Sequence, residues 1–307
     1  MHAVVPNSMT RRRATLIGFT AILMWGGLAL LTTLAGPVPP FQLVAMAFAV
    51  PGLASLALWT LRGEGLAHLR QKPIVWDLGL YGLFGYHFAY FIALRAAPPV
   101  EAGLIAYLSP LLIVLFSALL PGERLRWYHL GGALAGLAGT TLVVTDGGRV
   151  AFKVEFALGY AAAFACALIW SSYSVLSRRF GEVPTDAVGG FCMATAILAA
   201  LAHWALEPTV WPAGGEWLAV LALGIGPIGL AFFTWDIGMK RGDIQALGGL
   251  FYLAPLGSTA LLILFGKGEA SWTIGLATLL IVGGAVLATL DVLRRPVPSP
   301  AAPARTR

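Results

Sequence analysis

The chain has 307 residues, of which 58% are hydrophobic and 11% are charged. Soluble domains carry about 25% charged residues, so the composition excludes an ordinary soluble protein and indicates many segments within a lipid bilayer. The net charge of +6 does not indicate a nucleic-acid-binding protein, because the basic residues stand in small groups between apolar runs instead of forming one face.

Apolar runs of about 20 residues follow one another with only short polar breaks. In lipid, only helices and closed β-barrels satisfy all backbone hydrogen bonds. The runs lack the period-two alternation of barrel strands, so each is predicted to be a helix. The sequence predicts an all-α polytopic membrane protein with ten transmembrane helices, in chain order 14–34, 39–61, 73–94, 99–120, 127–145, 155–179, 185–206, 215–239, 244–265 and 272–292.

Lys and Arg are distributed unevenly over the loops between these predicted helices. With a cytoplasmic N-terminus, sixteen fall on the inner side and only four on the outer side, namely Arg95, Arg149, Lys153 and Lys267. Because basic loops stay in the cytoplasm, we predict a multi-pass protein of the cell (inner) membrane with both termini cytoplasmic. The asymmetry also supports ten helices, since losing one would move every later loop to the opposite side.

A block of the sequence recurs after 145 residues, so that Trp25 corresponds to Trp170 and Pro110 to Pro255. Each unit holds five predicted helices, and an odd number of crossings makes the second unit enter the bilayer from the opposite side. This inverted repeat is typical of secondary transporters. The predicted organisation is a cytoplasmic tail (1–13), a first five-helix repeat (14–148), a second, inverted repeat (149–293) and a disordered cytoplasmic tail (294–307).

Each half has a Trp in the middle of its first helix, a Tyr-Leu-x-Pro element in its fourth and a Glu soon after, at Glu123 and Glu269. In these features the chain resembles the EamA-type branch of the drug/metabolite transporter superfamily. The strings 13–18 (RATLIG), 100–110 (VEAG leading to YLSP) and 168–173 (LIWSSY) are similar to those of the YddG-type exporters of aromatic amino acids. The resemblance covers nearly the whole chain and implies two inverted five-helix halves.

Pro110 and Pro255 fall near the middle of their predicted helices. Each proline removes one backbone hydrogen bond and frees the carbonyl four residues earlier, at Ala106 or Phe251. Transporters meet the charged ends of a substrate with such interrupted helices, which a membrane tolerates only beside protein or a wet cavity. We interpret both prolines as helix breaks at a central cavity; the alternative is that they only bend their helices.

Aromatic residues are the main candidates for substrate binding. Trp25 and Trp170 are predicted near mid-depth, although membrane tryptophans usually prefer the interface, and their repeat relationship would bring them together. For any other single aromatic residue, simple filling of the bundle is the stronger interpretation.

His87 is the one titratable residue near the middle of a predicted helix. It could be a hydrogen-bonding residue of the cavity or a proton carrier, and the alternative is a neutral side chain bonded to a neighbouring helix. The predicted substrate-binding residues are Trp25, Tyr86, His87, Tyr90, Tyr107, Trp170, Tyr173, Trp235 and Tyr252.

Several polar residues lie near predicted helix ends. Gln42, Glu101 and Gln245 are candidates for gating contacts at a cavity mouth, the alternative being that they reach the membrane interface. We expect the Asp236 side chain to reach the membrane interface.

No acidic or basic side chain is predicted at the midplane, where an unpaired charge costs at least a few kcal/mol. The helices therefore favour a substrate without net charge. We expect a secondary transporter that exports small zwitterionic metabolites, above all aromatic and other neutral amino acids, by alternating access and in the simplest case down a gradient. The alternatives are an exporter of other metabolites or drugs with the same fold, or an intramembrane enzyme, for which Ser171, Ser172 and His87 are poor candidates.

The sequence predicts no catalytic residues, no metal site and no cofactor. The expected partners are a small neutral or aromatic amino acid and the lipid bilayer, with no nucleic acid and no obligate protein partner. The segment 224–229 matches the dinucleotide-binding string GxGxxG, but no strand precedes it, and a kinked helix is the better interpretation. Gly132 and Gly136 predict a close helix contact, with dimerisation as a further hypothesis.

Overall fold

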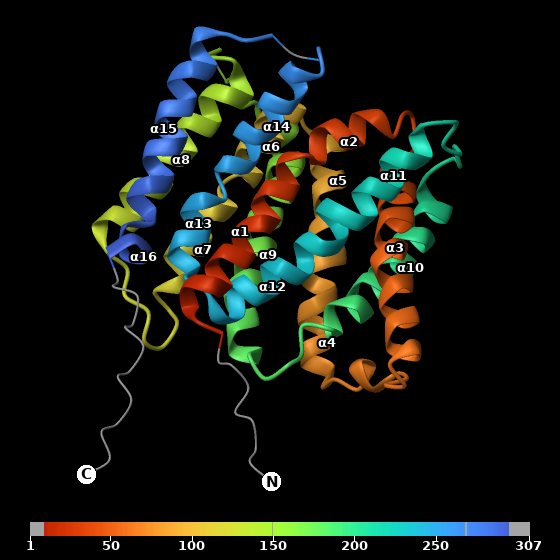
Figure 1. The fold of residues 1–307 in the computed structure, drawn as a ribbon. Coiled ribbons are helices and arrows are strands. Elements are labelled where there is room, and N and C mark those ends of the chain that lie inside the picture. The colour runs from red at the N-terminus through yellow and green to blue at the C-terminus, as the bar shows by residue number, and fades with distance from the viewer. Residues whose placement is uncertain (1–8, 149, 268, 295–307) are drawn as a thin grey trace, which may run out of the picture.

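The computed structural model describes residues 9–148, 150–267 and 269–294, and within these ranges all regular structure is helical (Figure 1). The predicted all-α class is confirmed. The predicted tails are described only at residues 9–13 and 294, and Arg149 lies outside the described ranges.

In the first part of the described chain, up to residue 148, several helices begin with a proline, a residue that is well suited to the first position of a helix. Its elements are α1 (Arg11–Gly26), α2 (Leu28–Leu34), α3 (Pro40–Leu61), the 3-10 helix η1 (Ala67–Leu69), α4 (Pro73–Leu80), the π-helix η2 (Tyr81–Gly85), α5 (Tyr86–Ala96), α6 (Pro99–Ala106), α7 (Ser109–Ser117) and α8 (Trp127–Thr145).

The second part is built from a similar succession of helices. Its elements are the 3-10 helix η3 (Val154–Phe156), α9 (Ala157–Ser177), the 3-10 helix η4 (Arg178–Phe180), α10 (Ala187–Leu206), α11 (Glu216–Ile225), the π-helix η5 (Gly226–Leu230), α12 (Ala231–Arg241), α13 (Ile244–Leu250), α14 (Leu253–Leu264), α15 (Trp272–Ala288) and α16 (Leu290–Arg294).

Helix occupies each of the ten predicted ranges. By length and composition, seven stretches of the described chain are able to cross a membrane, and α15 is apolar but shorter. The seven are Arg11–Leu34, Pro40–Leu61, Pro99–Ser117, Val154–Phe180, Ala187–Leu206, Glu216–Arg241 and Ile244–Leu264. The chain therefore has the helices of a multi-pass membrane protein.

The helix is interrupted in several of the predicted ranges, and not only beside Pro110 and Pro255. Single turn residues interrupt it at Gly27 and Thr289. The π-helices η2 and η5 lie at the same place in the two parts, since both 226 − 81 and 230 − 85 equal 145. The segment 224–229, interpreted as a kinked helix, spans the end of α11 and most of η5. Two-residue turns at 107–108 and 251–252 separate α6 from α7 and α13 from α14. The sequence block that recurs is thus accompanied by recurring irregularities of the backbone.

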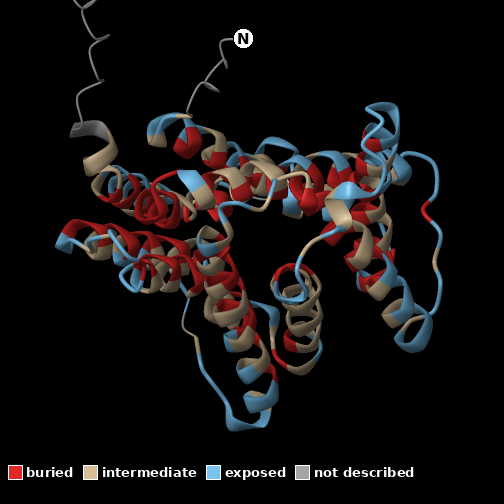
Figure 2. Ribbon diagram, turned by 90° about the horizontal axis from the view of Figure 1, so that it is seen from below, coloured by how far each residue is buried: buried red, intermediate tan, exposed pale blue. Residues whose placement is uncertain are grey.

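The helices pack in pairs that relate the two parts. Helix α3 packs on α10, α8 on α15, α1 on α12 and α5 on α9. Glycines permit the closest approaches: a Cβ atom on Gly18 of α1 would lie 2.8 Å from the Cα atom of Gly238 of α12. Buried residues concentrate where helices face one another, and exposed residues gather on loops and outward faces (Figure 2).

The molecule has two ends, which we name after a buried carboxylate at each. The Glu123 end, at the bottom of Figure 1, is where α1 begins and α9 and α16 end. The Glu207 end lies opposite, at the top of Figure 1, where α10 ends and α11 begins.

Candidate functional site

Five aromatic side chains meet where α12 packs against α1 and α9. The ring centroids of Trp25 and Trp170 are 5.4 Å apart in an edge-to-face arrangement, and Trp235 lies 5.1 Å from the first and 6.0 Å from the second. The two repeat-related tryptophans therefore touch each other instead of facing one another across a hollow. We call this group the aromatic cluster: Trp25, Trp170, Phe232, Trp235 and Phe251.

The three indole N–H groups of the cluster are in different states. Trp25 donates to the carbonyl oxygen of Pro227 in η5 at 2.9 Å, and Trp235 donates to the Ser174 hydroxyl at 3.1 Å. The N–H of Trp170, a residue 4% exposed, has no hydrogen-bond partner within the described chain. A buried donor without a partner is unfavourable, so a polar group placed beside this N–H would stabilise it.

Three predicted site residues lie in sequence on α5 beside the cluster. The Tyr86 ring is 5.6 Å from Trp170 and stacks on Tyr90 at 6.0 Å, while the His87 ring is 5.2 Å from Phe48. Tyr86, His87 and Tyr90 are half-buried, although Trp170 and Phe48, which the first two contact, are buried. This side of α5 thus retains accessible aromatic and polar surface next to the cluster.

The geometry fixes which nitrogen of His87 carries hydrogen. Its Nδ1 is 2.7 Å from the carbonyl oxygen of Leu83 in η2. Because a carbonyl oxygen can only accept, Nδ1 is the donor, and in the neutral ring Nε2 is left as an acceptor. His87 can therefore accept a hydrogen bond from an ammonium group.

The tyrosines at the two helix interruptions are joined to each other. The Tyr252 hydroxyl donates to the carbonyl oxygen of Tyr107 at 3.1 Å, across the turn that precedes Pro110. Tyr107 is half-buried, but Tyr252 is 0% exposed and Tyr173, 5.6 Å from Trp170, is 4% exposed. The structure thus gathers Trp25, Trp170, Trp235, Tyr173 and the α5 residues in one place, while Tyr252 is packed beside Tyr107.

At the Glu207 end, Gln42 is buried and bonds Val210 twice: its amide nitrogen donates to the Val210 carbonyl at 2.9 Å and its oxygen accepts from the Val210 N–H at 3.0 Å. Beside it, Glu207 accepts from Arg95 at 3.1 Å and from two backbone N–H groups at the start of α3. These bonds fasten the segment after α10 to α3 and α5. Glu101, the second gate candidate, is half-buried, and no hydrogen bond or ion pair of its side chain is found in the described chain.

At the Glu123 end, charged side chains from four segments converge. Glu123, in the loop between α7 and α8, accepts from Arg11 at 2.9 Å and from Arg178. Arg178 also donates to the carbonyls of Met239 and Gly242, and Arg11 lies 3.2 Å from Asp243. These residues link the start of α1, the end of α9 and the connection between α12 and α13.

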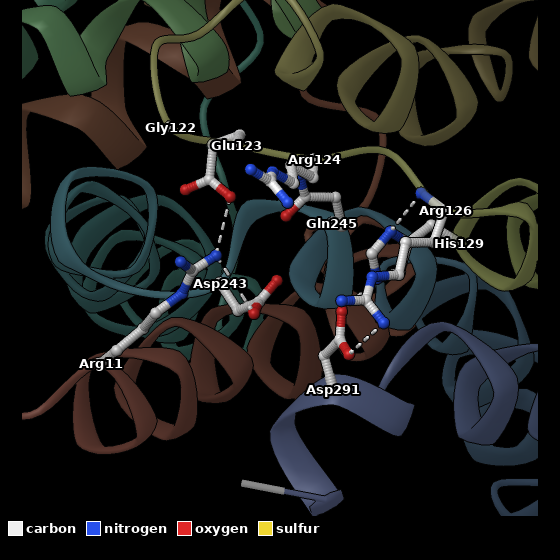
Figure 3. Close-up of a pocket in the computed structure, with 9 residues that line it drawn as sticks. All are labelled: Arg11, Gly122, Glu123, Arg124, Arg126, His129, Asp243, Gln245 and Asp291. Atoms are coloured by element: carbon white, nitrogen blue, oxygen red, sulfur yellow. Dashed lines mark hydrogen bonds and ion pairs between the residues drawn. The ribbon is translucent and has the colours of Figure 1, made fainter.

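The remaining gate candidate, Gln245, belongs to the same group. With its amide nitrogen facing the carboxylates, it donates to Glu123 and Asp243, both at 3.2 Å, and its oxygen accepts from Ser117 of α7 at 3.2 Å. We call the group the polar cluster: Arg11, Glu123, Arg178, Asp243 and Gln245. Four of its members line a polar hollow of about 90 Å³ together with Arg124, Arg126, His129 and Asp291 (Figure 3).

The position expected for Asp236 was wrong. Its side chain is 5% exposed, 2.9 Å from Lys240 and bonded to the Thr185 hydroxyl at 2.7 Å. It is thus neutralised inside the protein and does not reach the interface.

Sequence reasoning missed the phenylalanines of the aromatic cluster and most of the polar cluster. Phe232 and Phe251 are indistinguishable by residue type from the other apolar residues of their helices. Arg11 and Arg178 were interpreted only as topology signals, and Glu123 only as a family feature. A usable signal was the presence of acidic residues in otherwise basic loops. Within the described chain, no group of three or more His, Cys, Asp or Glu residues is arranged to hold a metal ion.

The sequence profile of the EamA-like transporter family matches the chain at residues 12–145 and again at 157–290. The chain is 60% identical over 283 residues to a protein of Ancylobacter novellus named aromatic amino acid exporter YddG, with 92% of this chain and 99% of the relative covered. A relative of the same name from Salmonella typhimurium is 27% identical over 302 residues, covering 94% and 100%. A solved crystal structure is 59% identical with a TM-score of 0.87, over 93% of this chain and 100% of the other. Because the two family matches together span most of its length, this chain belongs to the EamA-like transporter family.

Proposed function

We propose that the chain crosses the cell (inner) membrane ten times, as two inverted five-helix repeats at 14–148 and 149–293. The two family matches support this, because both their starts (157 − 12) and their ends (290 − 145) differ by 145 residues. The inversion is supported by the polar cluster: Glu123 binds Arg11 at the start of α1 and Arg178 at the end of α9, so the first helices of the two repeats run in opposite directions. The Glu123 end is then cytoplasmic and the Glu207 end faces outward.

We propose that this transporter exports aromatic and other neutral amino acids. The observation that carries the proposal is the aromatic cluster between repeat-related helices, in a chain 60% identical to a named aromatic amino acid exporter. Among the described residues, no Lys, Arg, Asp or Glu belongs to the aromatic cluster, and the rings that Tyr86, His87 and Tyr90 contact are aromatic, which suits a substrate without net charge.

Each part of such a substrate has a suitable partner at the site. Its aromatic side chain would stack on the accessible faces of Tyr86 and Tyr90. Its carboxylate would accept from the unpaired N–H of Trp170, and its ammonium would donate to Nε2 of His87. The matched interruptions of the helices, at the π-helices and beside Pro110 and Pro255, would let the two repeats rearrange around this site so that it opens to one side at a time.

Transport by purified protein in lipid vesicles tests the proposal. We expect counterflow of labelled tryptophan or phenylalanine without chemical change, which also distinguishes transport from an enzymatic reaction. Comparison with and without an imposed pH gradient tests whether protons are coupled; facilitated export predicts equal rates. A modified product, or exchange of drugs but not of amino acids, would overturn the assignment.

A pair of tryptophan variants tests the site itself. Trp170→Ala should lower aromatic amino acid transport by about tenfold or more at matched expression, the loss of roughly 1.4 kcal/mol of binding. Trp272→Ala is the control, because this tryptophan begins α15 and is 80% exposed. Since removing a buried ring can also weaken the fold, the half-buried Tyr90→Ala provides a second variant that should impair transport without that complication. Equal activity in all of them would contradict the site.

A further inference from the structure

Helices α5 and α12 occupy the same position in the repeat, since both 231 − 86 and 241 − 96 equal 145, but their surroundings differ. Four residues of α12 along one face are packed inside the protein: Phe232 and Trp235 belong to the aromatic cluster, and Asp236 binds Lys240. The corresponding residues of α5 are accessible. They are His87, Tyr90 and Phe91, which are half-buried, and Arg95, whose side chain is 51% exposed.

This face of α5 adjoins the candidate site. It begins at Tyr86, whose ring contacts Trp170 of the aromatic cluster. Helix α12 packs on α1 and also contacts α9, whereas α5 packs on α9 and has no comparable contact with α1. The face of α5 is therefore accessible because the second of these helices does not cover it.

Aromatic rings continue along this face from the candidate site toward the Glu207 end. The Phe91 ring lies 6.2 Å from Tyr90 and 6.4 Å from His87, and it packs edge-to-face on the buried Phe41 at 5.0 Å. The Arg95 guanidinium lies over the same Phe41 ring, 6.0 Å from its centroid. The face thus offers rings along its length and a cation at its outer end.

The Arg95 guanidinium has donors beyond those that the protein uses. A guanidinium carries five N–H donors. Within the described chain Arg95 donates to Glu207, at 3.1 Å, and makes no ion pair with Glu101, another acidic residue at this end. Glu207 is held separately by His203 and by backbone N–H groups at the start of α3. Because half of the Arg95 side chain is exposed, its remaining donors can bind a carboxylate, which the planar fork matches.

The corresponding cation of the second half is not available in this way. The Lys240 side chain is 6% exposed, and its ammonium group binds Asp236 at 2.9 Å and the Val183 carbonyl at 2.9 Å. Phe91 stands in α5 where Asp236 stands in α12, so Arg95 has no acidic neighbour one turn earlier on its own helix. The free donors of Arg95 are therefore a feature of the Glu207 end.

Arg95 lies too far along α5 to share a substrate with the candidate site. Eight residues separate it from His87 (95 − 87), which corresponds to about 12 Å along a helix. A substrate whose carboxylate accepts from Trp170 has no second carboxylate for Arg95. The two positions are therefore occupied at different stages of transport or by two molecules.

We propose that Arg95 and Phe91 form a second binding position for the substrate, the outer position, where the guanidinium binds the carboxylate of an amino acid that has left the aromatic cluster. This rests on the proposed transport of aromatic amino acids and on the orientation given above. The outer position selects for a carboxylate, because an aromatic amine of similar size has the ring but no group for Arg95 to bind. Substrate is thus released to the outside in two steps.

Protection of a cysteine from labelling tests the outer position. In a background with Cys166→Ala and Cys192→Ala, Leu94→Cys places a thiol at the half-buried residue next to Arg95. L-phenylalanine should slow the reaction of L94C with a membrane-impermeant maleimide severalfold, and phenethylamine, which lacks the carboxylate, should not. Adding Trp170→Ala weakens the candidate site, so protection that persists there reports on the outer position alone.

Variants of the arginine give the decisive comparison. Arg95→Gln should abolish the protection of L94C by L-phenylalanine, and Arg95→Lys, which keeps the charge, should restore most of it. Lys153→Gln is the control, because Lys153 is another cation of the Glu207 end, is 63% exposed and pairs with Glu155 at 3.6 Å. It should leave the protection unchanged. Equal labelling rates without ligand show that the variants keep their fold.

Two results would overturn the outer position. One is protection of L94C by L-phenylalanine that is as strong in R95Q as in the parent, and the other is equal protection by phenethylamine. These outcomes are distinct from failure of the proposed function. If vesicles showed no transport of aromatic amino acids, the function would be wrong, whereas transport without any protection of L94C would contradict only the outer position.

Discussion

Asp236 and Lys240 form an ion pair one turn apart on α12, and both side chains are almost fully buried at 5% and 6% exposure. Lys240 also donates to the Val183 carbonyl at 2.9 Å, and Thr185 donates to Asp236. The pair therefore connects α12 to the segment before α10. In the sequence, Asp236 lies near a predicted helix end, and we therefore expected it to be exposed. The expectation failed because the position of a residue along its helix does not reveal whether a distant segment of the chain covers it.

Removing one partner of this pair should be far more harmful than removing both. Lys240→Met leaves the Asp236 carboxylate buried without its partner, and we expect a loss of about 3–5 kcal/mol in unfolding free energy. The double variant Asp236→Leu with Lys240→Met should recover much of this loss, since two apolar side chains replace a desolvated pair. Thermal unfolding in detergent measures both. A double variant as unstable as K240M would contradict this account.

At the scale of elements, α8 and α15 form a close pairing of repeat-related helices. A Cβ atom on Gly132 would lie 2.5 Å from the Gly284 carbonyl oxygen and 2.8 Å from the Ala288 nitrogen, both backbone atoms of α15. The GxxxG pair predicted from the sequence thus serves a contact within the chain. Dimerisation through this face stays a hypothesis that the contact makes less attractive, because Gly132 is already covered.

Adjacent glycines provide a matched test of this contact. Gly132→Ala should cost about 1–3 kcal/mol, because backbone atoms of α15 must move to admit the methyl group. Gly131→Ala should be neutral or stabilising, because the nearest neighbour of its methyl group would be Leu287 Cδ2 at an ordinary distance of 3.5 Å, and alanine is the better helix former. Melting temperatures of the two variants give the comparison, and equal values would contradict the packing of α8 on α15.

The π-helices illustrate how an irregular element positions side chains. In η5, the Pro227 carbonyl accepts the indole N–H of Trp25, and in η2 the Leu83 carbonyl accepts Nδ1 of His87. π-helical turns occur frequently at functional sites. In both parts of the chain, therefore, a π-helix supplies a carbonyl that orients a side chain of the candidate site.

At the scale of the whole molecule, the proposed orientation in the membrane rests on the charge of the loops. Described residues at the start of α1 and the end of α16 lie at the same end, the Glu123 end (Figure 1). Reporter domains fused to Met1 and to Arg307 should both be active in the cytoplasm, in agreement with the excess of Lys and Arg on that side. Reporters on opposite faces would contradict both the orientation and the even number of crossings.

Much of the fold was accessible from the sequence. The ranges expected for helices agree with the structure, because a run of about 20 apolar residues is a local property that lipid converts into a helix. The candidate site was accessible only in part. Trp25 and Trp170 were selected by their repeat relationship, and their rings are in contact. Tyr252, chosen as an aromatic residue at similar depth, is 0% exposed and bonds the Tyr107 carbonyl. Which side of a helix a residue faces depends on partners far away in the chain.

The sequence by itself determined the membrane environment, the helix positions and the duplication, since hydrophobic length and a fixed spacing can be read along one dimension. The tertiary structure alone decided which helix surfaces pack on one another. Gly103 and Gly248 are the same residue in the same repeat position, yet a neighbouring helix fills the side-chain space only beside Gly248. Two halves with equivalent local patterns favour equivalent helices, and the difference between them comes from long-range contacts such as those of Glu123 with Arg11 and Arg178.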